Sequence, residues 1–187
     1  MKRGIRVVGV DDGPVPSGAG RSVFVAATVV RGDGQLDGLL CTRIRRDGWN
    51  ATERLIQLLC ESRFHPQIHA VMLDGIALGG LNVVDIQRLS QRLQRPVLTV
   101  VRRRPNRERF RAAVERLPRF EARWRLVERA GEVMAAGPIF CQCAGIGIES
   151  ARRLIAQTTL QGNLPEPIRL AHLIAGGVVS GESRGRA

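Results

Sequence analysis

Two aspartates that follow apolar runs are the residues best suited to chemistry in this sequence. Asp11 comes after residues 7–10 and Asp74 after residues 71–73, each entering a turn that contains glycine. If the two runs are neighbouring strands, the carboxylates lie a few ångströms apart, where like charges repel strongly. A bound cation relieves this repulsion, so the pattern indicates a metal site able to act on a phosphate.

Capping is the alternative explanation for the acidic residues. Asp12 suits a cap of the turn that it enters, and Asp74 suits a cap of the turn before the next helix. Glu53 lies three residues after Asn50, a variant of the capping box that stabilises the N-terminus of a helix. The residue pattern alone leaves metal binding and capping open at these positions.

The hydrophobic pattern predicts the elements that position these acids. Apolar runs joined by short turn-rich connectors predict three antiparallel strands, over residues 5–10, 22–30 and 36–45. A helix follows Asn50, and then come a strand, a helix and a strand over residues 68–73, 82–93 and 97–101. The strands of this second unit are continuous apolar runs, so we expect them to be buried and parallel. The remainder is less regular, with a helix over 105–117, an extended segment over 123–127, a strand over 138–143 and helices over 149–156 and 165–179.

Composition and charge limit the classes of protein to which this chain can belong. The 187 residues fit one domain, and the 44% hydrophobic and 25% charged shares are those of a globular chain. No apolar run is long enough to span a membrane and no signal peptide is evident, which predicts a cytoplasmic protein without a membrane partner. The net charge of +12, carried almost wholly by arginine, indicates a polyanionic partner, although a biased genome is another source of arginine. The four cysteines lack a C-x-x-C spacing, so we expect reduced core thiols and no structural zinc site.

The order of elements is that of the ribonuclease-H-like fold, an α/β fold with a mixed sheet and flanking helices. In that arrangement the first and fourth strands are neighbours, so Asp11 and Asp74 meet at one edge of the sheet and Glu53 faces them from the first helix. Three carboxylates around one or two Mg²⁺ ions can polarise a phosphate and activate water for in-line attack.

Several long strings resemble one family over residues 7–187. They are VVGVDDG, DGWNATERL, VMLDGIALGGLNVVD, PVLTVVRRRP, LPEPIRLAHLIA and GESRGRA. They are similar to the endonuclease-V-related family, most closely to its branch called endonuclease dU. The resemblance implies a magnesium-dependent endonuclease, with Mn²⁺ able to substitute, that nicks DNA at a deaminated base such as deoxyuridine in DNA repair.

The resemblance also implies roles for individual residues. Asp11, Glu53 and Asp74 match the metal ligands and catalytic acids, and Arg102 matches a basic residue that faces the substrate phosphate. His172, in PEPIRLAH, matches a position near the metal site, although a lone histidine on an apolar helix is more often a hydrogen-bonded core residue.

The surroundings of Trp49 depart from the family pattern. Endonuclease V has a Pro-Tyr-Ile-Pro wedge beside the lesion, whereas this chain has no tyrosine and carries RIRRDGWNA there. Trp49 is the aromatic residue in that stretch able to stack on an unpaired base, with a core or interface position as the alternative. Arg103 and Arg104 are expected to clamp phosphate together with Arg102, helped by the C-terminal Arg184 and Arg186.

Two other functions compete with the nuclease. A nucleic-acid-binding protein of the same fold that does not cleave is one alternative. The other is a nucleotide or phosphoester binder that uses DGIALGG before a helix as an anion site. The three carboxylates favour the nuclease over a protein that only binds, because a phosphate binder gains nothing from acids beside the backbone of its ligand. The sequence leaves open DNA or RNA as substrate and monomer or homodimer as assembly.

Overall fold

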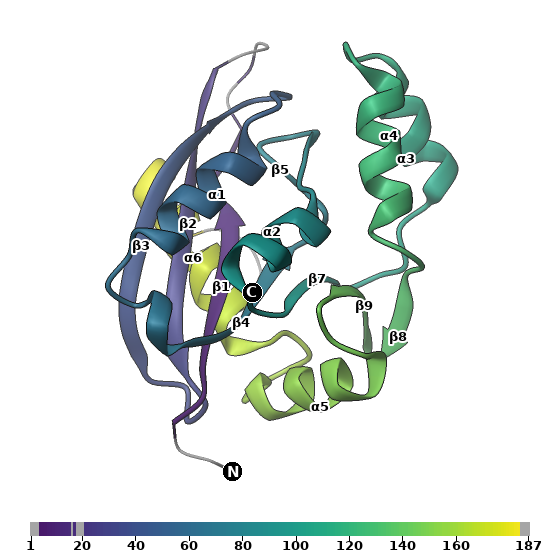
Figure 1. Ribbon diagram of the computed structural model, residues 1–187. Coiled ribbons are helices and arrows are strands. Elements are labelled where there is room, and N and C mark those ends of the chain that lie inside the picture. The colour runs from purple at the N-terminus through teal and green to yellow at the C-terminus, as the bar shows by residue number, and fades with distance from the viewer. Residues whose placement is uncertain (1–3, 16, 18–20, 184–187) are drawn as a thin grey trace.

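Seven strands form one mixed sheet in the computed structural model, which describes residues 4–15, 17 and 21–183. Their order across the sheet is β3-β2-β1-β4-β7-β9-β8 (Figure 1). The strands are β1 (Arg6–Asp12), β2 (Ser22–Arg31), β3 (Leu36–Arg45), β4 (Ile68–Asp74), β7 (Val97–Val101), β8 (Met134–Ala136) and β9 (Ile139–Ala144). A separate hairpin pairs β5 (Ala77–Leu78) with β6 (Asn82–Val83).

The strand directions confirm the predicted arrangement. β1 pairs antiparallel with β2 and β2 antiparallel with β3, whereas β1 with β4 and β4 with β7 are parallel pairs. The first and fourth strands are therefore neighbours, as the ribonuclease-H-like order requires.

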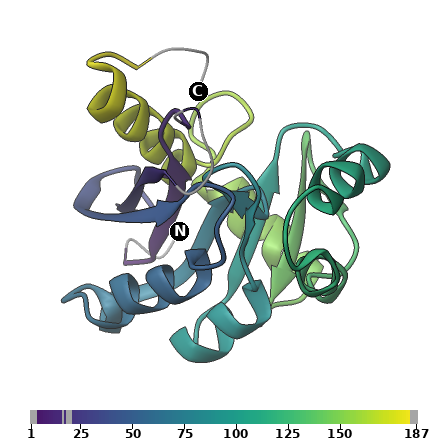
Figure 2. The same ribbon diagram turned by 90° about the horizontal axis from the view of Figure 1, so that it is seen from above.

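Helices cover both faces of the sheet (Figure 2). On one face lie α1 (Ala51–Cys60) and α2 (Ile86–Leu93), and on the other lie α5 (Ile148–Thr158) and α6 (Glu166–Ser180). α3 (Arg107–Glu115) and α4 (Phe120–Arg129) follow β7 in the chain and form a helical pair past its carboxyl end. A short 3₁₀ helix, His65–Gln67, precedes β4. No helix of the described residues is long and apolar enough to cross a membrane.

β4 shows why its sequence is a continuous apolar run. Successive side chains point to opposite faces of a strand. Val71 and Leu73 join the core beneath α1 and α2, while Ala70 and Met72 join the core beneath α5 and α6. Both faces are buried, so both sets are apolar.

The first turn of α6 lies directly against the sheet. The hydroxyl of Thr28 donates to the carbonyl of Pro167 over 2.7 Å. A Cβ atom on Gly9 would overlap with that same carbonyl group, so only glycine lets the helix approach β1 this closely. This contact fixes the position of α6 over β1.

Two predicted elements were wrong. The helix expected over 82–93 begins only at Ile86, because Asp85 caps it by accepting from the backbone N–H of Arg88, and the preceding residues form β6. The extended segment expected over 123–127 belongs to α4, whose buried residues Arg123, Trp124 and Val127 follow a helical period.

Two smaller expectations also fail. Asn50 is the residue before α1, but its side chain does not cap the helix and instead accepts from the backbone N–H of Arg45 and from the amide of Asn82. All four cysteines are free, yet Cys41 is exposed on β3 and is not a core thiol. Cys141 is buried on β9, as expected.

Candidate metal centre

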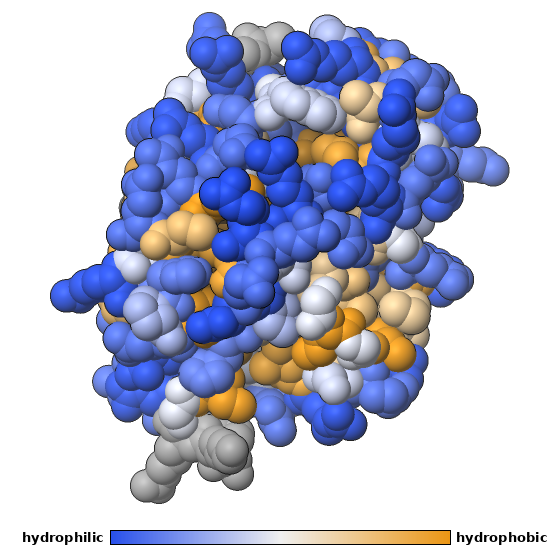
Figure 3. Space-filling model, viewed as in Figure 1, coloured by the Kyte–Doolittle hydropathy of each residue, from blue (hydrophilic) through white to orange (hydrophobic). Residues whose placement is uncertain are grey.

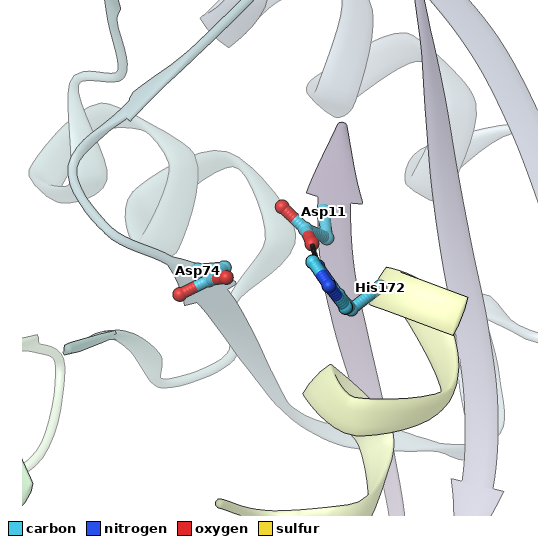
Figure 4. Close-up of side chains that lie close together, drawn as sticks. All are labelled: Asp11, Asp74 and His172. Atoms are coloured by element: carbon cyan, nitrogen blue, oxygen red, sulfur yellow. Dashed lines mark hydrogen bonds and ion pairs between the residues drawn. The ribbon is translucent and has the colours of Figure 1, made fainter. Parts of the chain in front are cut away.

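Asp11, Asp74 and His172 converge at the carboxyl ends of β1 and β4 (Figure 4). Val10 is in register with Leu73, so the two parallel strands deliver their aspartates to the same level. One ligand atom from each of the three residues lies within 4.8 Å of the others, which is close enough to share one ion.

His172 belongs to α6, which packs against β1, and its side chain reaches the two acids from that helix. Its Nδ1 lies 2.8 Å from Oδ2 of Asp11, in a hydrogen bond. The imidazole is about one-third exposed, whereas the Asp11 side chain is 8% exposed. His172 therefore faces the carboxylates, and the alternative of a buried core histidine is wrong.

The site disfavours negative charge in the absence of a cation. Burial raises the pKa of Asp11 to about 8, with further contributions from the charges of Asp74 and Asp12. Burial also raises the pKa of Asp74, although the charges of His172 and Arg102 oppose that shift. Carboxylate oxygens are the ligands that Mg²⁺ and Mn²⁺ prefer, whereas an imidazole suits transition metals such as Zn²⁺. The donor set therefore fits a divalent cation, which would compensate for the repulsion.

Asp12 lies on the opposite face of β1 from Asp11. Burial raises its pKa to about 6, and a hydrogen bond from the backbone N–H of Gly79 opposes the shift. Asp12 thus contacts the β5–β6 turn. Its charge still acts on the pair, since it contributes to the raised pKa of Asp11.

The structure does not bring Glu53 to the cluster. α1 packs against the face of the sheet opposite α6, and the Glu53 carboxylate pairs there with the guanidinium of Arg88 over 2.8 Å. Its side chain is 56% exposed. Among the described residues, the group able to hold a metal comprises Asp11, Asp74 and His172.

The arginines predicted to clamp phosphate follow β7 and are all exposed. Arg102 is near the carboxylates, because its charge lowers the pKa of both Asp11 and Asp74. The guanidinium of Arg104 lies 5.5 Å from the centre of the Phe140 ring. Arg184 and Arg186 lie outside the described residues.

Trp49 lies in the connection between β3 and α1, at the sheet edge where β1 ends. β3 runs in the same direction as β1, since both are antiparallel to β2. The indole is 40% exposed and rests against two guanidinium groups, that of Arg123 at 5.4 Å and that of Arg119 at 6.0 Å. Trp49 thus has a partly exposed ring at the edge of the sheet where β1 and β3 end. Its role as a wedge stays a prediction.

Arg123 is a buried residue that the sequence does not reveal. Its guanidinium donates to the carbonyl oxygens of Asp47, Gly48, Leu81 and Pro118. These bonds connect α4 to the β3–α1 connection and to the β5–β6 hairpin. Nothing in the local pattern distinguishes this arginine from its many solvent-facing counterparts.

The raised pKa values predict how stability depends on pH without metal. Folded Asp11 and Asp12 keep protons that their unfolded counterparts, with a pKa near 3.8, have lost. The free energy of unfolding should therefore fall as pH rises from about 4 to about 8, by roughly 1.4 kcal/mol per pH unit for each retained proton. Urea denaturation in EDTA measures this slope. Asp11→Asn should make the slope shallower, most clearly above about pH 6, where Asp12 no longer contributes.

The chain matches one family over nearly its whole length. The family model described as Endonuclease dU matches residues 3–179. A relative named UPF0215 protein, from Methanothermobacter thermautotrophicus, is 44% identical, with 100% of this chain and 94% of the relative covered. The crystal structure of a protein of unknown function from Archaeoglobus fulgidus is 39% identical, with a TM-score of 0.86 over 94% of this chain and 98% of that one.

More distant solved structures share the fold. Endonuclease V from Bacillus subtilis has a TM-score of 0.62 at 13% identity, covering 94% of this chain and 81% of its own. Endonuclease V from Ciona intestinalis, in complex with a 24mer DNA containing an inosine, has a TM-score of 0.58 at 14% identity, covering 89% and 82%. These likenesses confirm the predicted ribonuclease-H-like fold.

Proposed function

Because this chain belongs to the endonuclease dU family, we propose that it is a metal-dependent endonuclease that nicks DNA at a deaminated base, deoxyuridine or a related lesion, during repair. The observation that carries the proposal is the cluster of Asp11, Asp74 and His172 at the ends of two neighbouring parallel strands. Endonuclease V, which shares the fold, has been crystallised with inosine-containing DNA, and this supports a DNA substrate.

Each residue of the cluster has a distinct part in the proposed reaction. Asp11 and Asp74 would hold Mg²⁺ or Mn²⁺, which when bound stabilises charge on the phosphate and lowers the pKa of water. His172 orients Asp11 through the 2.8 Å hydrogen bond. Arg102 would contact the substrate phosphate beside them. We assign Glu53 to the helix surface because of its pair with Arg88.

The two competing functions have less support. In a protein that only binds phosphates, the buried Asp11 and the half-buried Asp74 would weaken the binding of a nucleic acid next to them. An anion site at DGIALGG would need a free helix N-terminus after the glycines. Gly79 and Gly80 instead form the β5–β6 turn, and the N-terminus of α2 is capped by Asp85.

A cleavage assay on defined oligonucleotides tests the proposal. Labelled duplex and single-stranded DNA would carry uracil, hypoxanthine, xanthine or no lesion, with matched RNA versions, in Mg²⁺, Mn²⁺ or EDTA. We expect nicking of at least one deaminated substrate in the presence of metal and none in EDTA. Equal cleavage with and without metal would contradict the assignment of the cluster.

The exposed arginines after β7 predict how binding depends on salt. If Arg103 and Arg104 contact phosphates, replacing both by alanine should make the slope of log affinity against log salt shallower by up to about two units on duplex DNA. The preference among bases should persist, because phosphate contacts position the duplex without reading it. Fluorescence anisotropy in EDTA measures both quantities.

Trp49→Ala is the contrasting variant for the same measurement. If the indole stacks on a base, the variant should lose lesion preference by about 1–3 kcal/mol with little change in salt slope. If replacing Arg103 and Arg104 by alanine leaves the slope of log affinity against log salt unchanged, these two side chains do not contact phosphates.

A further inference from the structure

β3 is a long strand with one free side. It lies at the edge of the seven-stranded sheet and, within the part of the chain that the structure describes, pairs with β2 alone (Figure 1). It has ten residues, whereas β8 at the opposite edge has three. Proteins usually keep edge strands short or cover them, because their free N–H and C=O groups can pair with another strand. The length of β3 is therefore unusual for an uncovered edge.

The free backbone groups of β3 belong to alternate residues. The N–H of Arg46 donates to the carbonyl of Arg21, so the even-numbered residues of this antiparallel ladder direct their backbone groups towards β2. The groups of Leu39 and Cys41 consequently point outward. Arg45 follows the same alternation, since its N–H points away from β2 and donates to a side chain in the β3–α1 connection. Among the described residues, none bonds to the outward groups of Leu39 and Cys41.

Apolar side chains accompany this free edge on the face of the sheet that carries α6. Leu39 is in register with Thr28, whose hydroxyl bonds to the first turn of α6. Leu36 and Leu39 are each 42% exposed, and Cys41 is exposed beside them. Val178 of α6 is 60% exposed. The face that carries α1 and α2 is instead covered mostly by hydrophilic side chains (Figure 3).

The charges along β3 suit pairing with a second copy of the same strand. The chain has a net charge of +12, so most approaches of two copies bring like charges together. Residues 38–42 carry no charge, with Asp37 before them and Arg43 after them. In an antiparallel pair centred on Leu40, the acid of each copy lies at the level of the base of the other. Asp37 already pairs with Arg31, so the gain is an absence of repulsion.

We propose that β3 pairs antiparallel with β3 of a second copy, giving a two-fold symmetric dimer with one continuous sheet. The register centred on Leu40 sets the outward groups of Leu39 against those of Cys41 in the second copy, so free donors meet free acceptors. The two Arg43 residues then lie about 20 Å apart along the strands, at roughly 3.3 Å per residue. Salt screens exposed charges beyond about 8 Å, so these arginines do not oppose the pairing.

This dimer directs its two metal clusters away from each other. β1 runs in the same direction as β3, because both are antiparallel to β2. The strands of the second copy run the opposite way, so the carboxyl ends of β1 in the two copies lie at opposite ends of the joined sheet. Each cluster therefore acts separately, and the dimer does not depend on the proposed nuclease activity.

Sedimentation velocity without nucleic acid tests the dimer. We expect wild type at micromolar concentrations to sediment with twice the mass of one chain. Cys41→Pro removes an outward N–H and no bond to β2, so the fold should persist while the dissociation constant of the dimer rises about tenfold or more. Leu39→Arg should also weaken the dimer, because it brings two like charges to within about 7–8 Å. Ala112→Arg, at an exposed position of α3, adds the same charge and should stay dimeric.

Cross-linking tests whether β3 forms the interface. In this register the two Cys41 residues lie on a diagonal, with Cα atoms about 7–8 Å apart, too far for a disulfide but within reach of a short bis-maleimide. We expect a cross-linked dimer from wild type and none from Cys41→Ser, although the other three cysteines remain. A monomeric wild type would overturn the inference. Dimers that persist unweakened in both Cys41→Pro and Leu39→Arg, with each variant folded by circular dichroism, would overturn it as well.

Discussion

Asp74→Asn should abolish nicking, lowering kcat by about a hundredfold or more at saturating Mg²⁺. The substitution keeps the size of the side chain but removes the charge that holds a cation beside Asp11. The rate of nicking of a labelled deaminated oligonucleotide measures the effect. Undiminished activity would refute a catalytic metal at this cluster.

The same variant should be no less stable than wild type without metal. Burial raises the pKa of Asp74, so the folded state resists its negative charge, and asparagine removes that cost. Thermal unfolding in EDTA measures this, and a markedly lower Tm would favour the capping interpretation of Asp74.

Glu53→Gln is the matched control. Because Glu53 pairs with Arg88 on the helix surface, its variant should nick at close to the wild-type rate. A loss comparable to that of Asp74→Asn would restore the ligand role that the family resemblance implies.

Gly9→Ala should cause the largest loss of stability, on the order of 3 kcal/mol. The added methyl group would overlap with the backbone of Pro167 and Ile168, which cannot rotate away as a side chain can. The first turn of α6 must then move off the sheet and carry His172 away from Asp11. Chemical denaturation measures the loss, and weaker Mg²⁺ binding should accompany it.

Gly4→Ala provides the reference for this substitution. Among the described residues beyond its chain neighbours, a Cβ atom at Gly4 meets no atom within 4 Å, so that variant should stay within about 0.5 kcal/mol of wild type. Equal stability of the two variants would mean that α6 is not held as closely to β1 as the structure shows.

The strands were predictable because their pattern depends on local chemistry. The runs over β1, β2, β4 and β7 are largely apolar and bounded by turns, and β3 lies between two turn-rich segments, so the parallel and antiparallel pairs followed from element order. α4 was missed because Phe120, Ala122, Trp124 and Leu126 alternate with charged residues, a period of two that is typical of a strand. Its helical period becomes visible only through what it buries, namely Arg123, Trp124 and Val127.

The site was predictable only in part. Asp11 and Asp74 stand out as acids at the ends of apolar runs, and adjacent strands then bring them together. His172 is 161 residues from Asp11 in the chain, and no local pattern indicates that contact. Glu53 pairs with Arg88 away from the cluster, because the resemblance fixes its place in the chain but not the partner that its side chain finds.

The bonds of Arg123 bear on the entropy of ligand binding. One guanidinium joins α4, the β3–α1 connection and the β5–β6 hairpin through carbonyl oxygens on all three segments. Loops that must become ordered when a ligand arrives reduce affinity by the conformational freedom that they lose. Here the segment that carries Trp49 and the β5–β6 hairpin are held in place beforehand. A nucleic acid would therefore meet a preorganised surface, and most of its ordering cost would fall on the nucleic acid itself.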